Sequence, residues 1–425
     1  MNTPFFTVDP RLSALSDKAM ERAADAFARI EEVSAYNQQK VLAAFIHNKV
    51  SESHFTPTTG YGYGDRGREV MDAVFAEAMG AEDALVRHYL LSGTHAITVA
   101  LFGLLRPGDT LLAATGAPYD TLETVIGKTG AEGSLMEHGV AYREVPLNSE
   151  QRPDLPAVQA ALRADPAIRV VHIQRSRGYN TRESLSVAAI GAIIAAVREV
   201  RPEVTVFVDN CYGEFVEKTE PTAVGADVMA GSLIKNPGGG IAENGGYICG
   251  RHDLVERIAA RMTTPGLGRE VGASLGHNRT LFMGLFQSPH VVGEALKTAV
   301  YAAALFEELG YEVSPRATAP RADIVQVVKL GDPEALIAFC RGMQSGAPVD
   351  AFVVPEPWDM PGYDSPVIMA AGAFTMGASI ELSADAPLRE PFAAYMQGGI
   401  NFPSGQMGVL LAAQSMLEAG ALKLN

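Results

Sequence analysis

Two charged side chains stand at the ends of consecutive strand-like runs near the middle of the chain. The apolar, β-branched run 204–208 ends at Asp209, and a second run, 227–233, leads to Lys235. Such runs are typical of buried strands, and open α/β sheets place ligands at the carboxyl ends of their strands. A lysine amine forms a Schiff base with an aldehyde, and a carboxylate keeps a pyridine nitrogen protonated. The pair therefore favours pyridoxal 5'-phosphate (PLP) as cofactor.

A lysine and an aspartate at strand ends are also typical of ordinary surface positions, so other features must decide. Glycines surround the lysine, in Asn236-Pro-Gly-Gly-Gly and again from Gly245 onward. Further upstream, Ser92-Gly93-Thr94 forms a small-residue turn before a helix. A helix start offers free N–H groups and a positive dipole end, which bind phosphate readily, although an N-capping serine gives the same pattern. The turn is therefore a candidate phosphate site.

Two more side chains extend this candidate site. Tyr119 lies at a strand-to-helix junction, from which its ring can stack on a planar cofactor; a capping aromatic in a loop is the alternative. Ser232 precedes Lys235 closely and can add a hydroxyl to the phosphate site. Cys211 follows Asp209 closely, and we expect it to act as a small buried hydrophobe.

Two loops carry arginines. The stretch 51–69 places two tyrosines and two arginines on Gly-rich backbone, so it is either a domain linker or an anion-binding loop. The stretch 174–182 contains three arginines in nine residues. Its position after a buried strand favours anion binding over a solvated surface.

Alternating strands and helices must position these residues. Short apolar runs and helical periodicity alternate through the middle of the chain, which predicts an α/β fold with a mostly parallel central sheet and helices on both faces. Periodicity over 11–50, interrupted near 34–37, predicts two amphipathic helices before it. The last part mixes helices at 290–309, 333–342 and 405–422 with strand-like runs at 323–329, 349–354, 367–370 and 376–382.

We therefore expect three parts of the chain. They are an N-terminal helical segment and arm at 1–60, a large PLP-binding α/β domain at 61–285, and a smaller α+β domain at 286–425.

The length, net charge and cysteine count limit the possible classes of protein. The chain of 425 residues carries a net charge of −15, which argues against nucleic acid or an anionic membrane as partner. The N-terminus lacks the layout of a signal peptide, and no apolar run reaches the roughly 18 residues of a membrane span, so we expect a cytoplasmic protein. The three cysteines form no CxxC motif, and His95 has no partner at metal-ligand spacing, so we expect neither a disulfide framework nor a metal site.

Several stretches together carry a resemblance to a known family. The chain resembles fold-type I PLP enzymes with the aspartate aminotransferase fold, specifically the methionine gamma-lyase / cystathionine beta-lyase-like family often labelled aluminium resistance proteins. Each stretch alone is a weak signal, and their combination is specific. They are Thr59-Gly-Tyr-Gly-Tyr-Gly-Asp-Arg-Gly-Arg-Glu, Ser92-Gly-Thr-His-Ala, Leu105-Arg-Pro-Gly-Asp, Ile173-Gln-Arg-Ser-Arg-Gly-Tyr, Val208-Asp-Asn-Cys-Tyr-Gly-Glu-Phe, Gly231-Ser-Leu-Ile-Lys-Asn-Pro-Gly-Gly-Gly and Gly377-Ala-Ser-Ile-Glu-Leu-Ser-Ala-Asp-Ala-Pro-Leu-Arg.

The resemblance implies a role for each candidate residue. Lys235 would hold PLP as a Schiff base and, once freed, move protons. Asp209 would pair with the pyridine nitrogen, and Tyr119 would stack on the ring. The phosphate would be held by Ser92, Gly93, Thr94 and Ser232.

The resemblance also implies shared active sites in a homodimer or homotetramer. In related lyases a tyrosine and an arginine from a neighbouring subunit reach the phosphate, and the candidates here are Tyr61 or Tyr63 with Arg66. The candidate for the substrate carboxylate is Arg389, with Arg175 and Arg182 behind it.

The implied reaction is β- or γ-elimination at a carbon–sulfur bond of an amino acid, which yields a 2-oxo acid, ammonia and a thiol. Because the same lysine and aspartate serve other PLP reactions, an aminotransferase or aldolase activity is an alternative. A PLP-fold binding or regulatory protein without turnover is a second alternative. A nucleotide-binding loop at Asn236-Pro-Gly-Gly-Gly is disfavoured, because its lysine precedes the glycines and GxxxxGK[ST] is not matched.

Overall fold

The computed structural model describes residues 3–180, 182–360 and 365–424. The chain divides into two compact units, a larger one of Asn37–Gln287 and a smaller one that combines Met1–Tyr36 with Ser288–Asn425. The candidate cofactor residues all belong to the larger unit, whereas Arg389 belongs to the smaller one.

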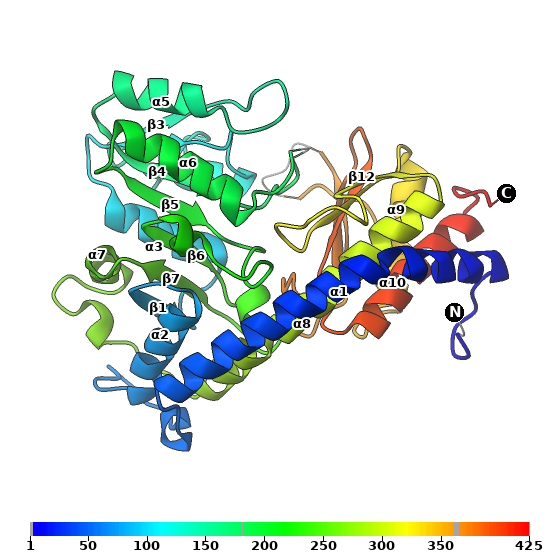
Figure 1. The fold of residues 1–425 in the computed structure, drawn as a ribbon, viewed down its shortest axis with the longest axis horizontal. Helices are drawn as coiled ribbons and strands as arrows, with labels where there is room; N and C mark the ends of the chain where they lie inside the picture. Colours follow the sequence, from blue (N-terminus) through cyan, green and yellow to red (C-terminus); the bar gives the residue numbers. More distant parts are fainter. Residues whose placement is uncertain (1–2, 181, 361–364, 425) are drawn as a thin grey trace. The chain divides into compact units, whose positions relative to one another are not determined.

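The larger unit is built on a seven-stranded sheet within the described residues, with the strand order β1-β7-β6-β5-β4-β2-β3 (Figure 1). From β3 to β6 the neighbouring strands run parallel, and β7 and β1 are added antiparallel at the other end. The expectation of a mostly parallel sheet is therefore confirmed. The strands are β1 (Asp83–Arg87), β2 (Thr110–Ala113), β3 (Ala141–Glu144), β4 (Ile168–Gln174), β5 (Thr205–Asp209), β6 (Val228–Ser232) and β7 (Gly246–Gly250).

Helices cover both faces of this sheet (Figure 1). Helix α3 packs its apolar residues, Ile97 and Ala100 among them, on the core formed by Phe207, Ala230 and Ile248 of the central strands. Helices α5 and α6 lie side by side. The helices are α2 (Arg66–Ala78), α3 (Gly93–Leu104), α4 (Asp120–Ile126), α5 (Leu155–Ala164), α6 (Val187–Val200) and α7 (His252–Met262), with short 3-10 turns η1 (Glu52–Phe55), η2 (Pro221–Val224), η3 (Asn236–Gly238) and η4 (Gly268–Glu270).

The N-terminal helix differs from the expectation of two helices, because α1 runs without a break from Pro10 to His47. The sequence around 34–37 contains no glycine or proline, and serine or asparagine inside a helix costs only about 0.5 kcal/mol relative to alanine. Asn37 is fully buried, and its amide donates to the carbonyls of Phe215 and Glu217, 3.0 Å away in each case. These tertiary hydrogen bonds offset the weak local preference.

The smaller unit contains a five-stranded antiparallel sheet in the order β10-β11-β12-β9-β8, again within the described residues. Helices α9 and α10 pack against one another, and α9 also contacts the sheet. Residues of α8 complete an alanine- and leucine-rich core. Helix α8 (Asn278–Glu308) begins in the larger unit and enters the smaller one at Ser288. The other elements are β8 (Glu312–Ser314), β9 (Gln326–Lys329), α9 (Pro333–Ser345), β10 (Val367–Ala371), β11 (Ser383–Pro387), β12 (Ala393–Gln397) and α10 (Phe402–Glu418).

Several expected bounds in the C-terminal part were wrong. The strands expected at 349–354 and 376–382 do not form, and Phe352 and Met376 are 85% and 96% exposed. The sheet instead uses β11 and β12, which are rich in alanine and therefore give a weak strand signal. Helix α8 begins at Asn278 and not at 290, with Pro289 in its interior, a position that proline usually disfavours.

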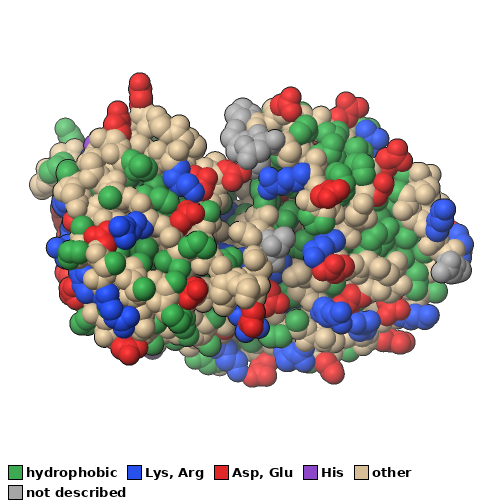
Figure 2. All heavy atoms as spheres, turned by 90° about the horizontal axis from the view of Figure 1, so that it is seen from above, with side chains coloured by type: hydrophobic (Ala, Val, Ile, Leu, Met, Phe, Trp, Pro, Cys, Tyr) green, Lys and Arg blue, Asp and Glu red, His purple; other side chains and the backbone are tan. Residues whose placement is uncertain are grey.

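The surface carries charges of both signs. On the face drawn in Figure 2, lysine and arginine side chains are interspersed with aspartate and glutamate. No helix among the described residues is long and apolar enough to span a membrane.

Candidate active site

The carboxyl ends of three neighbouring parallel strands bring the central candidate residues together. Gln174 at the end of β4 pairs in register with Asp209 at the end of β5, and Asp209 pairs with Ala230 of β6. Strand β6 ends at Ser232, and the chain then turns to place Lys235 just before η3. The sheet therefore fixes the backbones of these residues along one edge, where open α/β sheets bind ligands.

Asp209 is a buried carboxyl with little charge compensation. It is 3% exposed, and it accepts hydrogen bonds from the backbone N–H of Cys211, at 3.1 Å, and from the Cys211 thiol. Burial raises the pKa of Asp209, and the opposing charges of Lys235 and Arg182 reduce this effect without reversing it. A cationic ring nitrogen at this carboxyl would favour its ionised form.

Lys235 extends its amine into the same group of side chains. Its Nζ lies 4.1 Å from the centre of the Tyr212 ring. Burial opposes the positive charge, but the surrounding groups, which include Cys211, Tyr212 and Asp209, raise the pKa of the Lys235 amine well above its ordinary value. The lysine is therefore held as an ammonium ion next to one carboxyl and an aromatic face.

The Ser92-Gly93-Thr94 turn starts α3 and faces the ends of β5 and β6. The Ser92 hydroxyl caps the helix by accepting the N–H of His95 at 3.1 Å, so the capping role is observed directly. A Cβ atom on Gly93 would lie 3.0 Å from the Cys211 sulfur and 3.2 Å from the Cβ of Ser232. A side chain at this position would crowd these neighbours, so glycine favours the close approach, which gathers hydroxyls and helix-start N–H groups in one place.

Tyr119 belongs to the same group. Its hydroxyl lies 3.3 Å from the hydroxyl of Thr94, and its backbone N–H donates to Oε1 of Gln174 at 3.2 Å. Burial, followed by the negative potential of Asp209, raises the pKa of the Tyr119 phenol well above its ordinary value, so the ring stays neutral. A neutral ring at this position suits stacking on a planar, electron-poor ligand.

The residues at this edge fit the chemical parts of PLP. Lys235 supplies an amine for an aldehyde, Asp209 a carboxylate for a ring nitrogen, and Tyr119 a neutral aromatic face. The start of α3 and the Ser232 hydroxyl supply donors for a phosphate.

The loop before α2 presents three of the predicted residues to solvent. Tyr61 and Tyr63 are 69% and 59% exposed, and their rings stack with centres 5.5 Å apart. Arg66, the first residue of α2, is also exposed. The loop itself is fixed, because an added Cβ on Gly62 would meet the backbone of Ala273 at 2.6 Å. Exposed aromatic and cationic side chains on a fixed loop are available to another subunit.

Arg175 has a structural position that argues against the expected substrate role. Its side chain is fully buried and donates to Asn210 at 2.8 Å and to Glu217 at 2.9 Å, with Glu220 also in contact. An added Cβ on Gly213 would lie 2.3 Å from the Arg175 side chain. The guanidinium is therefore committed to holding the loop after β5 in place.

Arg182 is likewise bound within its own loop. It is 2% exposed, and its NH2 group donates to the carbonyls of Gln174 and Ser176 at 2.8 and 2.6 Å. The positive charge still acts on Asp209 electrostatically. Arg389, in the smaller unit, is exposed and follows β11.

Sequence reasoning missed three residues that position the site. Gln174 orients Tyr119, Tyr212 lies under the lysine amine, and Asn236 donates to the carbonyls of Tyr212 and Glu214 at 3.0 Å each. Gln174 and Asn236 are each adjacent in sequence to a predicted residue or loop, and this adjacency could have indicated them as site residues. The position of the Tyr212 ring depends on a left-handed backbone, with φ of 71°, which a local sequence pattern does not predict.

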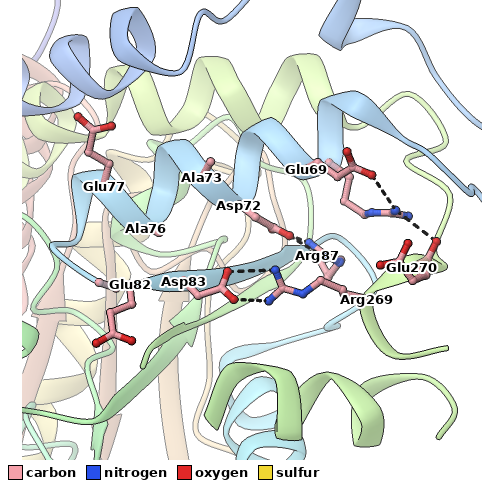
Figure 3. Close-up of a pocket in the computed structure, with 12 residues that line it drawn as sticks. Glu69, Asp72, Ala73, Ala76, Glu77, Glu82, Asp83, Arg87, Arg269 and Glu270 are labelled. Carbon is pink, nitrogen blue, oxygen red and sulfur yellow. Dashed lines mark hydrogen bonds and ion pairs between the residues drawn. The ribbon is translucent and has the colours of Figure 1, made fainter. Parts of the chain in front are cut away.

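A separate cavity of about 460 Å³ lies beside α2 and β1, and none of the predicted site residues line it (Figure 3). Charges that line it are paired: the buried Arg87 contacts Asp72 at 2.6 Å, and the half-buried Arg269 contacts Asp83 at 2.7 Å. Near it, Asp83, His252 and Glu256 could in principle surround a metal ion. Arg269 binds both carboxylates of that group, so a cation is already present there.

Comparison with known proteins shows the same family over nearly the whole chain. The methionine gamma-lyase family model matches residues 12–417. A carbon-sulfur lyase involved in aluminium resistance from Clostridium novyi has a TM-score of 0.93 and 47% identity over 96% of both chains.

Two further proteins extend the comparison. The uncharacterized protein YnbB of Bacillus subtilis is 48% identical over 95% of this chain and 97% of its own. The PLP-dependent protein YhfS of Escherichia coli has 20% identity and a TM-score of 0.61 over 92% of this chain and 97% of its own, which shows a shared fold. The expected fold-type I architecture is thus confirmed, and the chain belongs to the methionine gamma-lyase family of carbon–sulfur lyases.

Proposed function

We propose that this protein binds PLP at Lys235 and cleaves a carbon–sulfur bond of an amino acid, releasing a 2-oxo acid, ammonia and a thiol. The observation that supports this most directly is the shared edge of Lys235 and Asp209, where a half-buried lysine and a buried carboxyl stand among neutral aromatic and hydroxyl groups. A cytoplasmic location remains part of the proposal.

PLP, when bound, supplies a sink for the electrons left on the substrate's α-carbon. Asp209 would hold the ring nitrogen in its protonated form, which strengthens that sink. Lys235 would hold the cofactor and, when its amine is free, would accept the α-proton on Nζ and deliver it later to the leaving group or the product. Tyr119 would restrict the ring to one orientation.

The phosphate would be bound by the start of α3 and the Ser232 hydroxyl, with Tyr61 or Tyr63 and Arg66 added from a second subunit. The exposure of these three side chains supports such a shared site. For the substrate carboxylate we retain Arg389, because the guanidinium groups of Arg175 and Arg182 are bound internally.

The first test is the visible absorption spectrum of the purified protein. We expect a band near ~420 nm, typical of PLP bound to a lysine, that is lost in Lys235→Ala. Lys18→Ala, at an exposed lysine of α1, is the matched control and should keep the band. A wild-type protein that stays colourless after incubation with PLP would contradict the proposal.

Products then identify the reaction. S-methylcysteine should yield pyruvate, ammonia and methanethiol if the enzyme performs β-elimination, and methionine should yield 2-oxobutyrate, ammonia and methanethiol if it performs γ-elimination. A 2-oxo acid formed only with a second 2-oxo acid present, without thiol release, would indicate an aminotransferase. Binding of PLP with no product from any amino acid would favour the regulatory alternative.

Subunit sharing has its own test. In a mixed dimer of Arg66→Ala and Lys235→Ala chains, a shared site would pair Lys235 of one chain with Arg66 of the other. Mixing two weakly active variants should therefore restore activity, up to about one wild-type site per mixed dimer. If each site uses only its own chain, mixing restores nothing.

A further inference from the structure

The aromatic residue under the lysine amine is held in an unusual backbone conformation. Tyr212 has a φ of 71°, in the left-handed region that bulky side chains rarely adopt. Such conformations persist only where the surroundings impose them, and they concentrate at functional sites. Phe215, three residues later, has a φ of 62°. The segment after Asp209 is therefore a strained bend, and the position of its side chains is set by other parts of the unit.

The bend is fixed from two sides. From one side, the buried guanidinium of Arg175 lies against Gly213, where an added Cβ would approach to 2.3 Å. From the other side, the buried Asn236 amide donates to the carbonyls of Tyr212 and Glu214 at 3.0 Å each. Asn236 directly follows Lys235, so one side chain ties the backbone of the lysine to the backbone of the tyrosine.

This arrangement brings the Nζ of Lys235 to 4.1 Å from the centre of the Tyr212 ring. That distance is well inside the limit of about 6 Å at which an aromatic face attracts a cation, and the attraction is larger where water is excluded. The other titratable groups that act on the amine are Asp209 on β5, Cys211 and Glu214 on the bend, and Tyr119 at the start of α4. Asp209 is the anionic group among them, and burial raises the pKa of Glu214 to about 8, so that acid is largely neutral at pH 7.

We propose that Tyr212 is a catalytic residue: its ring face stabilises the ammonium ion that Lys235 becomes when its free amine takes the substrate's α-proton, and Asn236 fixes that ring in place. The inference rests on the proposed function, because it concerns the stage at which the lysine acts as a base. With PLP bound, the lone pair of Nζ would take the α-proton as the C–H bond breaks, the cofactor would supply the sink for the C–H electron pair, and the ammonium ion formed would face the ring. The π face of Tyr212, and not its phenol hydroxyl, stabilises the ammonium ion.

Two variants separate the ring from the hydroxyl. Tyr212→Phe keeps the aromatic face and removes the hydroxyl, whereas Tyr212→Leu keeps apolar bulk and removes the aromatic face. For the loaded enzyme we expect Tyr212→Leu to lower kcat by about 10- to 30-fold, the effect of losing a desolvated cation–π contact, with KM changed less than about threefold. Tyr212→Phe should stay within about threefold of wild type in both constants.

A second measurement uses the protein without PLP. The rate at which an amine-reactive reagent labels Lys235, followed by mass spectrometry as a function of pH, reports the pKa of that amine directly. Tyr212→Leu should move the midpoint of this curve down by about one pH unit, and Tyr212→Phe should leave it in place. Asn236→Ala, which frees the bend, should move it in the same direction as Tyr212→Leu.

The outcomes distinguish the possibilities. If Tyr212→Leu labels Lys235 with the wild-type midpoint, or if Tyr212→Phe is impaired as much as Tyr212→Leu, the proposal is overturned. Circular dichroism and the visible band check that each variant folds and binds PLP. If wild type itself binds no PLP, the proposed function fails, while the labelling curves still show whether the ring holds the ammonium ion.

Discussion

Two groups of buried charge in the larger unit are built on opposite rules. Beside α2 and β1, each buried charge meets an opposite charge: both guanidinium NH groups of Arg87 contact Asp72 at 2.6 and 2.8 Å, and both of Arg269 contact Asp83 (Figure 3). At the edge formed by β5 and β6, Asp209 accepts from Cys211, and the amine of Lys235 lies over an aromatic ring.

This difference distinguishes charges that stabilise the fold from charges that are available to a ligand. A buried pair that satisfies itself has no capacity left for a ligand, although breaking it is costly. A buried acid and a half-buried amine with few neighbours of opposite charge have shifted pKa values and free hydrogen-bonding capacity, which is typical of functional sites. The cavity beside α2 is therefore a structural feature, and the edge formed by β5 and β6 is the candidate active site.

The largest expected effects come from neutralising one acid in each group. Asp72→Asn should destabilise the protein by about 3–5 kcal/mol, because it leaves the buried Arg87 without its carboxylate. Asp209→Asn should leave the free energy of unfolding within about 1 kcal/mol of wild type, because it removes a buried charge that few groups compensate. It should also lower kcat at least about 100-fold.

Urea unfolding and steady-state kinetics, measured on both variants, test whether Asp72→Asn loses stability and Asp209→Asn loses rate. The rate per folded Asp72→Asn molecule should be close to wild type. The comparison would be wrong if Asp209→Asn unfolded the protein and kept its rate, or if Asp72→Asn removed activity without loss of stability.

A histidine one strand away tests whether a shifted pKa alone marks a functional site. His172 on β4 is fully buried, and its Nε2 has no hydrogen-bond partner among the described residues. Burial, followed by the charge of Arg182, lowers the pKa of His172 to about 4. The unfolded chain, with an ordinary histidine pKa of about 6.5, therefore binds more protons between these values, and stability must fall as pH falls through this window.

The expected loss from this one group is about 3 kcal/mol between pH 6.5 and pH 4. In His172→Leu that part of the pH dependence should disappear, while kcat at pH 7.5 stays within about threefold of wild type. A large loss of kcat in this variant would show that the ring serves the chemistry and that the contrast between the two groups is incomplete.

The larger unit was predicted well because its signals are local. Each central strand is a short apolar run, each following helix repeats at three or four residues, and Asp209 and Lys235 stand at the ends of such runs. The family resemblance rests on the same stretches and is confirmed by the comparisons. The roles of the individual site residues remain predictions.

What sequence missed depends on contacts between distant segments. Strands β11 and β12 consist largely of alanine and polar residues, so only their pairing with neighbouring strands identifies them. The unbroken α1 depends on bonds from Asn37 to residues far along the chain. The internal partners of Arg175 could not be foreseen for the same reason, because Glu217 and Glu220 belong to a later loop.

Two arginine variants test the same comparison, and their expected effects are the smallest. Arg175 follows the rule of the paired group, since its buried guanidinium meets two carboxylates, whereas Arg389 is exposed on the smaller unit. Arg175→Gln should therefore cost about 2–3 kcal/mol of stability and leave KM close to wild type, because it leaves the buried Glu220 without its guanidinium partner and does not touch substrate. Arg389→Gln should leave stability within about 0.5 kcal/mol and raise KM about 10- to 100-fold, the effect of losing a charge-assisted bond to a carboxylate.

Arg316→Gln, at another exposed arginine of the smaller unit, is the matched control and should change neither quantity. A KM effect at Arg175 with unchanged stability would assign the substrate carboxylate to the larger unit. It would also show that a guanidinium bound by two carboxylates, one of them fully buried, can still exchange one of them for a ligand, which the contrast between paired and uncompensated charge excludes.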